Sequence, residues 1–361
     1  MDYNSIRRKT KEIKIGNVLI GGNNKIAIQS MTNTDTSDSS STIKQIEDLS
    51  AAGCDIVRIT VPDIKSAETI AKIKDKGITI PIVADIHFDY KIALKCAELG
   101  VDKIRINPGN IGDDNNVKAV CDACNKKNIP IRIGVNSGSL EKNILSKYGA
   151  PTAEALVESA MYHISLLEKY DFNNIVVSIK ASNVENMIKS NRLLADKISY
   201  PIHLGVTEAG GYKSGLVKSS IGIGSLLSDG IGDTLRVSLT DDPIVEISSA
   251  KTILSALDIK GQSGLNIISC PTCGRTKIDL INLVNRFEKA VFDEGLMDVP
   301  VKVALMGCIV NGPGEAREAD IGIAGGKGEA LLFSKGEIIR KIPENEIIST
   351  LINSVKEMGG K

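Results

Sequence analysis

Three cysteines in the last third of the chain have the spacing expected of ligands for a metal centre. Cys270 and Cys273 form a C-x₂-C pair in a loop that also contains proline and glycine, and Cys308 follows the next predicted strand. This part of the chain has no fourth cysteine and no histidine, so a four-ligand zinc site lacks a ligand. Three thiolates suit an iron–sulfur cluster that keeps one iron for an exchangeable ligand, for which Glu315 is the candidate carboxylate. A redox disulfide or inert thiols are the alternatives.

The other four cysteines lack such surroundings. Cys121 and Cys124 repeat the C-x₂-C spacing, but they lie within a predicted helix without glycine or proline, where both thiols share one face. Cys54 and Cys96 fall at apolar positions of the same part of the chain. We interpret all four as buried core residues.

Polar side chains interrupt the β-branched runs that are predicted as strands. In the run 56–61, Arg58 and Thr60 alternate with aliphatic residues, so they share one face of the strand. The same period of two pairs Asp85 with His87, Arg105 with Asn107, Arg132 with Asn136, Ser178 with Lys180, and Arg236 with Ser238. The aliphatic residues are expected to face helices, so the polar set points into a barrel near the carboxyl ends of its strands, where barrel enzymes have their active sites.

Five of these inward residues are cationic: Arg58, Arg105, Arg132, Lys180 and Arg236. The interior acids found in the sequence, Asp85 and Glu208, are too few to pair with all of them. Desolvation of an unpaired cation costs several kcal/mol. The pattern therefore favours a ligand with more than one negative charge, such as a phosphorylated or diphosphorylated small molecule. Buried ion pairs within the barrel are the structural alternative.

The elements that position these residues follow a repeated pattern of a short β-branched run, a polar turn and a helix-period stretch. Eight such units predict an α/β fold, a (β/α)8 TIM-type barrel, with a doubly wound open sheet as the alternative. After a linker at 260–264, the remaining residues predict a small α/β domain, so we expect a substrate-binding barrel at 1–259 and a cluster-binding domain at 260–361. The predicted barrel strands are 26–32, 56–61, 81–86, 103–108, 131–136, 175–180, 202–207 and 234–239.

Composition excludes several classes of function. The 361 residues include 44 Lys and Arg against 44 Asp and Glu, and only 3% are aromatic. A general nucleic-acid or anionic-membrane binder needs a basic excess, and base stacking needs aromatic side chains. The basic start of the chain is not followed by an apolar segment, so no secretory signal is expected, and a cytoplasmic location is predicted.

Eight segments carry a resemblance to a known family. They are IQSMT (28–32), VRITVP (57–62), ADIHF (84–88), IRINPGN (104–110), RIGVN (132–136), TEAG (207–210), SCPTCGR (269–275) and MGCIVNGPGE (306–315). From about Arg8 to its end, the chain resembles the bacterial 4-hydroxy-3-methylbut-2-enyl diphosphate synthases of the methylerythritol phosphate route to isoprenoids. The resemblance implies reductive ring opening and dehydroxylation of 2-C-methyl-D-erythritol 2,4-cyclodiphosphate.

The resemblance also implies site residues, a cofactor and partners. A 4Fe-4S cluster is expected on Cys270, Cys273, Cys308 and Glu315, with electrons from flavodoxin or ferredoxin, in a homodimer. Glu208 is our candidate for proton delivery, and the iron position guarded by Glu315 is expected to open for substrate. The substrate-binding residues implied are Arg58, Asp85, Arg105, Asn107, Arg132, Asn136, Lys180, Arg236 and Ser238.

Two other classes of function stay open at this point. One is a non-redox barrel enzyme acting on a phosphorylated sugar, with a structural zinc module in place of the cluster. The other is an electron carrier without chemistry of its own, which the inward cations argue against. A radical enzyme using S-adenosylmethionine is excluded, because the chain lacks a C-x₃-C-x₂-C motif.

Overall fold

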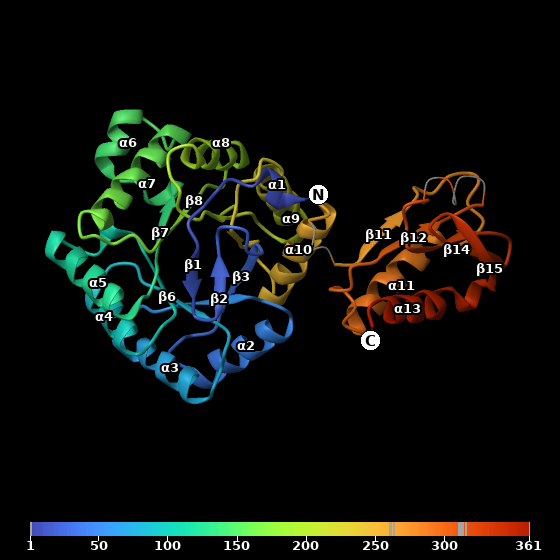
Figure 1. Ribbon diagram of the computed structural model, residues 1–361, viewed down its shortest axis with the longest axis horizontal. Coiled ribbons are helices and arrows are strands. Elements are labelled where there is room, and N and C mark those ends of the chain that lie inside the picture. Colours follow the sequence, from blue (N-terminus) through green and yellow to red (C-terminus); the bar gives the residue numbers. More distant parts are fainter. Residues whose placement is uncertain (1, 260–261, 263, 310–313, 315, 361) are drawn as a thin grey trace. The chain divides into compact units, whose positions relative to one another are not determined.

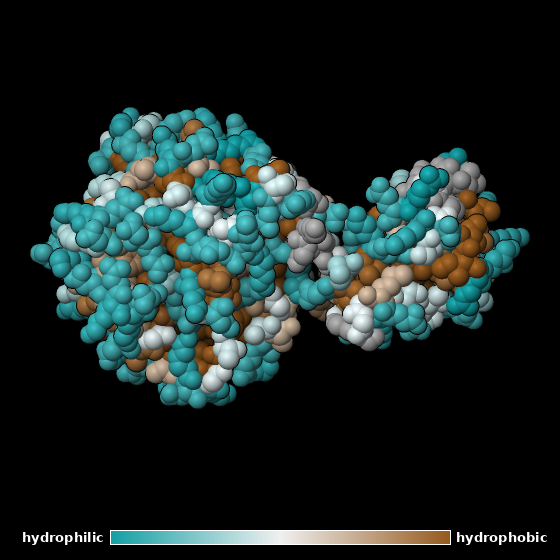
Figure 2. All heavy atoms as spheres, viewed as in Figure 1, coloured by the Kyte–Doolittle hydropathy of each residue, from teal (hydrophilic) through white to brown (hydrophobic). Residues whose placement is uncertain are grey.

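The structure of the chain, a computed structural model, describes residues 2–259, 262, 264–309, 314 and 316–360. The chain folds into two compact units, Asp2–Ile253 and Leu254–Lys361, each with its own sheet (Figure 1). The outer helices of the first unit present mostly hydrophilic side chains in Figure 2. Among the helices described, none is both long and apolar enough to cross a bilayer.

The first unit is a barrel of parallel strands. The residues that the structure describes contain eight of these strands. Hydrogen-bonded neighbours follow the order β8-β7-β6-β5-β4-β3-β10-β9, and a parallel bridge between Val177 and Ile202 joins the two ends of this order. The predicted (β/α)8 barrel is therefore confirmed. Its strands are β3 (Ala27–Met31), β4 (Ile56–Thr60), β5 (Ile82–Asp85), β6 (Lys103–Ile106), β7 (Ile131–Asn136), β8 (Ile175–Lys180), β9 (His203–Leu204) and β10 (Thr234–Leu235).

Helices surround the strands (Figure 1). Several begin where a short polar side chain accepts a hydrogen bond from a backbone N–H of the first turn, as Asp38 does from Ser41 and Asp63 does from Ser66. These caps fix where the chain turns from loop to helix. The helices of the barrel unit are α2 (Ser39–Ala51), α3 (Ile64–Asp75), α4 (Tyr90–Glu98), α5 (Asp114–Lys127), α6 (Lys142–Tyr148), α7 (Ala153–Glu168), α8 (Val184–Ala195), α9 (Tyr212–Ser228) and α10 (Pro243–Ala256), with short 3₁₀ turns η1 (Pro108–Asn110) and η2 (Ser137–Ser139).

An N-terminal segment that the sequence pattern did not predict closes the amino-terminal end of the barrel. It contains α1 (Tyr3–Ile6) and an antiparallel hairpin of β1 (Ile13–Ile15) and β2 (Val18–Ile20). Three isoleucines of the hairpin pack against the first inward residues of four barrel strands, in a cluster of Ile13, Ile15, Ile20, Ala27, Ile56, Val83 and Val176. The buried ion pair between Arg7 and Asp233, at 2.6 Å, fastens this segment to the strand region before β10.

The last two barrel strands are shorter than predicted. Regular pairing ends at Leu204 in β9 and Leu235 in β10, although the runs 202–207 and 234–239 keep the strand pattern. Single backbone hydrogen bonds continue the direction of the strands, from the Arg236 N–H to the Leu204 carbonyl and from the Thr207 N–H to the Ala181 carbonyl. The inward residues after Leu204 and Leu235 therefore stay at the carboxyl end of the barrel.

The second unit is an α/β sheet domain, as predicted. Its sheet has the order β11-β12-β13-β14-β15, with the first three strands parallel and the last two antiparallel to their neighbours. Helices α11 (Leu280–Asp293) and α13 (Ile347–Met358) lie on one face of the sheet (Figure 1), and Phe287 and Leu351 pack there with Leu305 and Ile323. The elements are β11 (Asn266–Ser269), α11 (Leu280–Asp293), β12 (Lys302–Met306), β13 (Ile321–Gly325), β14 (Glu329–Ser334), β15 (Glu337–Pro343), η3 (Glu344–Glu346) and α13 (Ile347–Met358).

Candidate active site

A charged cavity of about 160 Å³ lies at the carboxyl ends of the barrel strands. All of the residues that line it are polar or charged. They come from strands β4 to β8 and from the segments that follow β5, β9 and β10. Eight of the nine predicted substrate residues are among them. The lining residues are Arg58, Asp85, His87, Arg105, Arg132, Asn136, Ser178, Lys180, Thr207, Arg236 and Ser238.

Two of the cavity arginines share a carboxylate. Asp85 accepts a hydrogen bond from Arg105 Nη1 at 3.0 Å, and Arg58 Nε lies 3.7 Å from its other oxygen. Burial alone would raise the pKa of Asp85, but the charges of Arg58 and Arg105 outweigh burial and hold this pKa below its ordinary value. Burial lowers the pKa of Arg58 to about 10, so its guanidinium stays charged at neutral pH.

A second interior carboxylate, Glu246, was missed by the sequence analysis. Both of its oxygens bind Arg236, at 3.0 Å from Nε and 2.9 Å from Nη2, and Ser30 donates a third hydrogen bond. Asp85 is an interior acid as expected, but Glu208 is exposed, and the second interior acid is Glu246, which enters the barrel end from helix α10. A glutamate in the first turn of a helix carries no strand-period signal that would mark it as inward.

Even with Glu246, the cations exceed the acids. Arg132 and Lys180 have no carboxylate partner in the described part of the chain, and the Nε and Nη1 atoms of Arg132 are buried there without a hydrogen-bond acceptor. Burial and the neighbouring arginines lower the pKa of both side chains well below their ordinary values. An anion that entered the cavity would relieve this cost of desolvation.

More buried polar groups lie inside the barrel beside the cavity. Lys103 is fully buried, and burial together with Arg132 and Arg58 holds its pKa well below the ordinary value of a lysine. Burial likewise lowers the pKa of His203, whose Nδ1 is 2.7 Å from the Thr234 hydroxyl. Neither residue was singled out from the sequence, although both occupy inward positions at the start of their strands.

Two glycines make room for the cavity cations. A Cβ atom on Gly134 would lie 2.4 Å from Arg105 Nε, and one on Gly205 would lie 2.8 Å from Lys180 Nζ. Any side chain at these positions would displace the cation that it met, because both glycines point inward. The RIGVN segment therefore contributes an arginine and also the space for a neighbouring one.

Two predicted residues lie outside the lining of the cavity. Asn107 is buried directly after β6, and its Oδ1 has no hydrogen-bond partner among the residues described. Glu208 is exposed in the loop between β9 and α9, and its backbone is left-handed with φ of 53°. This conformation is strained for a residue other than glycine, and such strain is concentrated at functional sites.

The three cysteines of the C-terminal domain lie on loops at the carboxyl ends of β11 and β12, which pair in parallel. Cys270 Sγ accepts a hydrogen bond from the Gly307 N–H at 3.2 Å, which brings the loop before Cys308 close to the first cysteine. Cys273 is exposed, and a hydrogen bond from the Arg275 backbone lowers the pKa of its thiol. The predicted fourth ligand, Glu315, lies outside the described residues.

These thiols have the donor chemistry of a cluster site, in which each cysteine binds a different iron. Within the described ranges, no three His, Cys, Asp or Glu side chains lie close enough together to hold one metal ion. The exposed thiol of Cys273 with its lowered pKa, and the sulfur of Cys270 that already accepts a backbone N–H, both have features of thiolate ligands. The described residues therefore fit the group chemically.

The barrel cysteines are core residues, as predicted. All four are buried, and burial raises the pKa of Cys54, Cys96 and Cys121 to about 12 and that of Cys124 further. A thiol with so high a pKa is neither a nucleophile nor a ready ligand at neutral pH.

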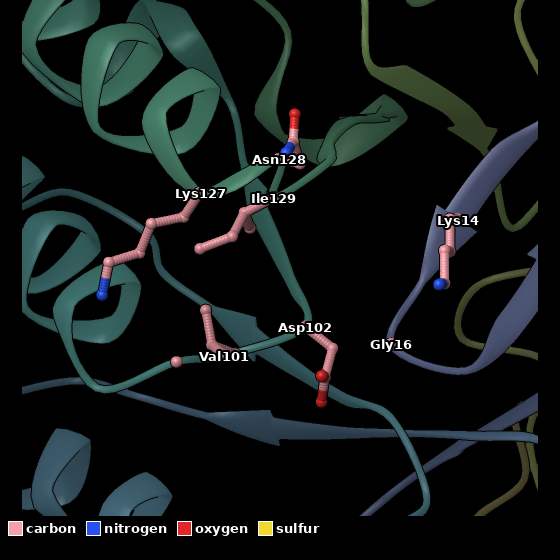
Figure 3. Close-up of a pocket in the computed structure, with 8 residues that line it drawn as sticks. Lys14, Gly16, Val101, Asp102, Lys127, Asn128 and Ile129 are labelled. Carbon is pink, nitrogen blue, oxygen red and sulfur yellow. The ribbon is translucent and has the colours of Figure 1, made fainter.

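A larger hollow, of about 510 Å³, opens at the amino-terminal end of the barrel (Figure 3). Its charged residues include Lys14, Lys127 and Asp102, but Asp102 is occupied by Lys74 at 2.7 Å and by the Ile82 N–H at 2.8 Å. No unpaired buried charge faces this hollow among the residues described. It therefore offers less to an anionic substrate than the cavity at the opposite end of the strands.

Family models match both units of the chain. Residues 10–251 match the GcpE TIM-barrel domain, and residues 266–357 match the GcpE protein C-terminal domain. One solved structure that the chain resembles is dihydropteroate synthase from Yersinia pestis, at 10% sequence identity. The match covers 68% of this chain and 98% of that protein, and its TM-score of 0.48 is too low to support an inference.

Curated relatives are similar over nearly their whole length. The proteins from Fusobacterium nucleatum and Clostridium perfringens are each 57% identical, over 98% and 97% of this chain and 98% and 99% of their own. The protein from Geobacter sulfurreducens is 53% identical over 98% of this chain and 99% of its own. All three are named 4-hydroxy-3-methylbut-2-en-1-yl diphosphate synthase (flavodoxin). With both of its domains matched, the chain belongs to the GcpE family.

Proposed function

We propose that the protein is a 4-hydroxy-3-methylbut-2-enyl diphosphate synthase, which converts 2-C-methyl-D-erythritol 2,4-cyclodiphosphate to (E)-4-hydroxy-3-methylbut-2-enyl diphosphate. The observation that carries this proposal is the excess of buried cations in the barrel cavity of a GcpE-family chain. Opening the ring and removing a hydroxyl as water consumes two electrons and two protons. The chain must therefore bind a diphosphate, deliver electrons and supply protons.

The diphosphate belongs in the barrel cavity. Arg132 and Lys180 lack carboxylate partners among the described residues, so they are the first contacts we assign to it. Arg58, Arg105 and Arg236 are already oriented by Asp85 and Glu246 and add further positive charge. Asn136 and Ser238 line the same cavity and offer polar contacts, and Asn107 is buried directly after β6, the strand of Arg105.

The three C-terminal cysteines and Glu315 are the ligands that we assign to a 4Fe-4S cluster. When bound, such a cluster supplies single electrons and an iron with an exchangeable position. The support from this chain is the donor set of Cys270, Cys273 and Cys308 on adjoining strand ends and the N–H donor of Gly307 to Cys270. Glu315 is the ligand that would give way to a substrate oxygen.

Glu208 is the residue that we assign to proton delivery. Its exposed carboxyl and left-handed backbone, in the loop that follows Thr207 of the cavity lining, support a role at the mouth of the barrel. A purely orienting role is the competing assignment. Glu208→Gln separates the two, because loss of turnover with unchanged iron content and unchanged substrate affinity supports proton delivery, whereas unchanged turnover excludes it.

The partners follow from the same assignment. Reduced flavodoxin is the electron donor that the names of the relatives indicate, with ferredoxin as the other candidate. We assign a homodimer in the cytoplasm, in which the barrel of one chain works with the cluster domain of the other. Mixing Arg132→Met chains with Cys273→Ala chains tests this, because turnover should reappear only if two chains share a site.

Anaerobic reconstitution with iron and sulfide, followed by an assay of the cyclic diphosphate with a low-potential reductant, tests the function as a whole. Turnover that depends on iron and sulfide is the expected result. Zinc binding without iron, together with loss of turnover, would favour the non-redox barrel enzyme with a structural zinc module. The names of the curated relatives give no support to that alternative.

A further inference from the structure

Met31 lies at the carboxyl end of β3, between two strands that each carry a cavity arginine. The pairing register places Met31 beside Arg58 of β4, and β10, which ends just before Arg236, is the other neighbour of β3. Met31 Sδ accepts hydrogen bonds from Arg58 Nε at 3.1 Å and Nη2 at 2.8 Å, and Arg236 Nη1 lies 3.5 Å from the same sulfur. One thioether therefore contacts both guanidinium groups.

The interior carboxylates engage the two arginines to different extents. Asp85 lies 3.7 Å from Arg58, and Glu246 takes Nε and Nη2 of Arg236. Met31 accepts from the donors that make no hydrogen bond to these acids, which are Nε and Nη2 of Arg58 and Nη1 of Arg236. Because both arginines are mostly withdrawn from solvent, with side chains 12% and 15% exposed, an N–H without an acceptor here would be costly.

A thioether differs from a carboxylate in this position in one decisive respect. Sulfur is a weak, polarizable and uncharged acceptor, so it orients the guanidinium groups without reducing their positive charge. A third acid would hold the arginines more strongly, but it would also compete with the ligand for them. A leucine would preserve the charge and lose the acceptor.

We propose that Met31 is a positioning residue that holds Arg58 and Arg236 in the geometry for a diphosphate while leaving their charge available to it. This inference rests on the proposed function, since it assigns both arginines to the substrate. Orientation before binding reduces the conformational entropy that the two side chains lose when the anion arrives. Met31 therefore acts mainly on affinity and far less on the steps that follow binding.

The test compares three substitutions in the anaerobically reconstituted full chain, with inorganic pyrophosphate as the probe at one fixed pH. Met31→Gln keeps an uncharged acceptor and should bind within about twofold of wild type. Met31→Leu should bind about five- to tenfold more weakly, the ratio that corresponds to one net hydrogen bond. Met31→Glu should bind most weakly of all, although it offers the strongest acceptor.

The kinetic readout is the split between KM and kcat for the cyclic diphosphate, which should show Met31→Leu raising KM by a larger factor than it lowers kcat. Met187→Leu is the matched control, because Met187 is fully buried in α8 and lies outside the cavity lining. The inference would be overturned if Met31→Leu bound pyrophosphate as tightly as wild type, or if Met31→Glu bound it as tightly as Met31→Gln. Either result would leave the proposed function standing. Wild-type protein that fails to bind pyrophosphate would overturn both.

Discussion

The barrel and the C-terminal domain prepare their functional groups in different ways. In the barrel, cations stand on neighbouring strands, and Asp85, Glu246 and Met31 already fix the direction of three arginines. In the C-terminal domain, the cysteines stand on loops, and Cys273 is exposed. Parallel strands hold the first set in register, whereas only the ends of β11 and β12 hold the second near one edge.

This difference shows how each site gains its geometry. A cavity on strands is rigid before the ligand arrives, so much of the cost of ordering it is met during folding. Loops with thiol ligands are ordered by the metal centre itself, since metal binding and local folding are coupled. The barrel is therefore expected to bind its anion without the cluster, and the cluster domain to hold iron without the anion.

The largest expected effect separates the two regions completely. Cys273→Ala should lose iron and all measurable turnover, because a cluster with two remaining cysteine ligands is not retained. Its pyrophosphate affinity should equal that of wild type. Iron and sulfide content, turnover and calorimetric titration of the same preparation measure all three quantities.

Cys121→Ala is the control for that substitution, since Cys121 is buried in α5 of the barrel. It should retain iron and turnover. Pyrophosphate affinity that fell together with iron content in Cys273→Ala would show that the two regions do not form their sites independently.

A change in the barrel should produce the opposite pattern. Arg132→Met should weaken pyrophosphate binding by about 30-fold or more, the loss expected when a buried charged contact worth at least about 2 kcal/mol is removed. Iron content should not change. The melting temperature should rise by a few degrees, because Arg132 is a buried cation without a carboxylate partner in the described structure.

Lys127→Met is the matched control, because Lys127 lies at the hollow of Figure 3 at the opposite end of the barrel. It should bind pyrophosphate as wild type does. A fall in melting temperature for Arg132→Met would mean that this arginine stabilises the fold and is not held in reserve for an anion.

A smaller effect is expected from pH. The folded protein holds the pKa of Lys180 well below that of a free lysine, and a bound anion would raise it again. Binding of the cyclic diphosphate without reductant should therefore take up protons and weaken as pH rises, by at most about tenfold per pH unit for one proton. The folding stability of the free protein has the opposite pH dependence. The unfolded chain binds more protons than the folded protein, so the free energy of unfolding increases with pH through the same range.

Calorimetry in two buffers with different ionisation enthalpies measures this proton uptake. The ligand does not itself exchange protons near neutral pH, because each phosphorus of the cyclic diphosphate carries one strongly acidic group that does not titrate there. The observed binding enthalpy should differ between the buffers. Equal enthalpies would show that the lysine keeps its proton in the free protein.

The smallest effect is expected at the barrel thiols. Iodoacetamide at pH 8 should leave Cys54, Cys96, Cys121 and Cys124 unmodified in the folded protein, because burial raises the pKa of each thiol to about 12 or above. The three C-terminal cysteines should react in protein without iron and be protected after reconstitution. Mass spectrometry of proteolytic fragments distinguishes the two groups.

The sequence predicted the barrel well because strand period and chemistry coincide. The bounds of β7 and β8 match the expected runs, and the polar residues of the predicted inward face line the cavity, with the exception of Thr60 and Asn107. The hairpin of β1 and β2 was missed, because three-residue strands carry too little periodicity, and Glu246 was missed because it comes from a helix. Met31 was missed for a different reason, since an apolar side chain at a strand end gives no sign that it accepts hydrogen bonds.

The most direct test of the two-region account is a crystal structure of the anaerobically reconstituted protein with pyrophosphate, with anomalous scattering measured at the iron edge. We predict one 4Fe-4S cluster, bound by Cys270, Cys273, Cys308 and Glu315. We also predict pyrophosphate within hydrogen-bond distance of Arg132 and Lys180. Iron bound elsewhere, or pyrophosphate absent from the barrel cavity while Arg132 and Lys180 pair with acids of the chain, would contradict the account.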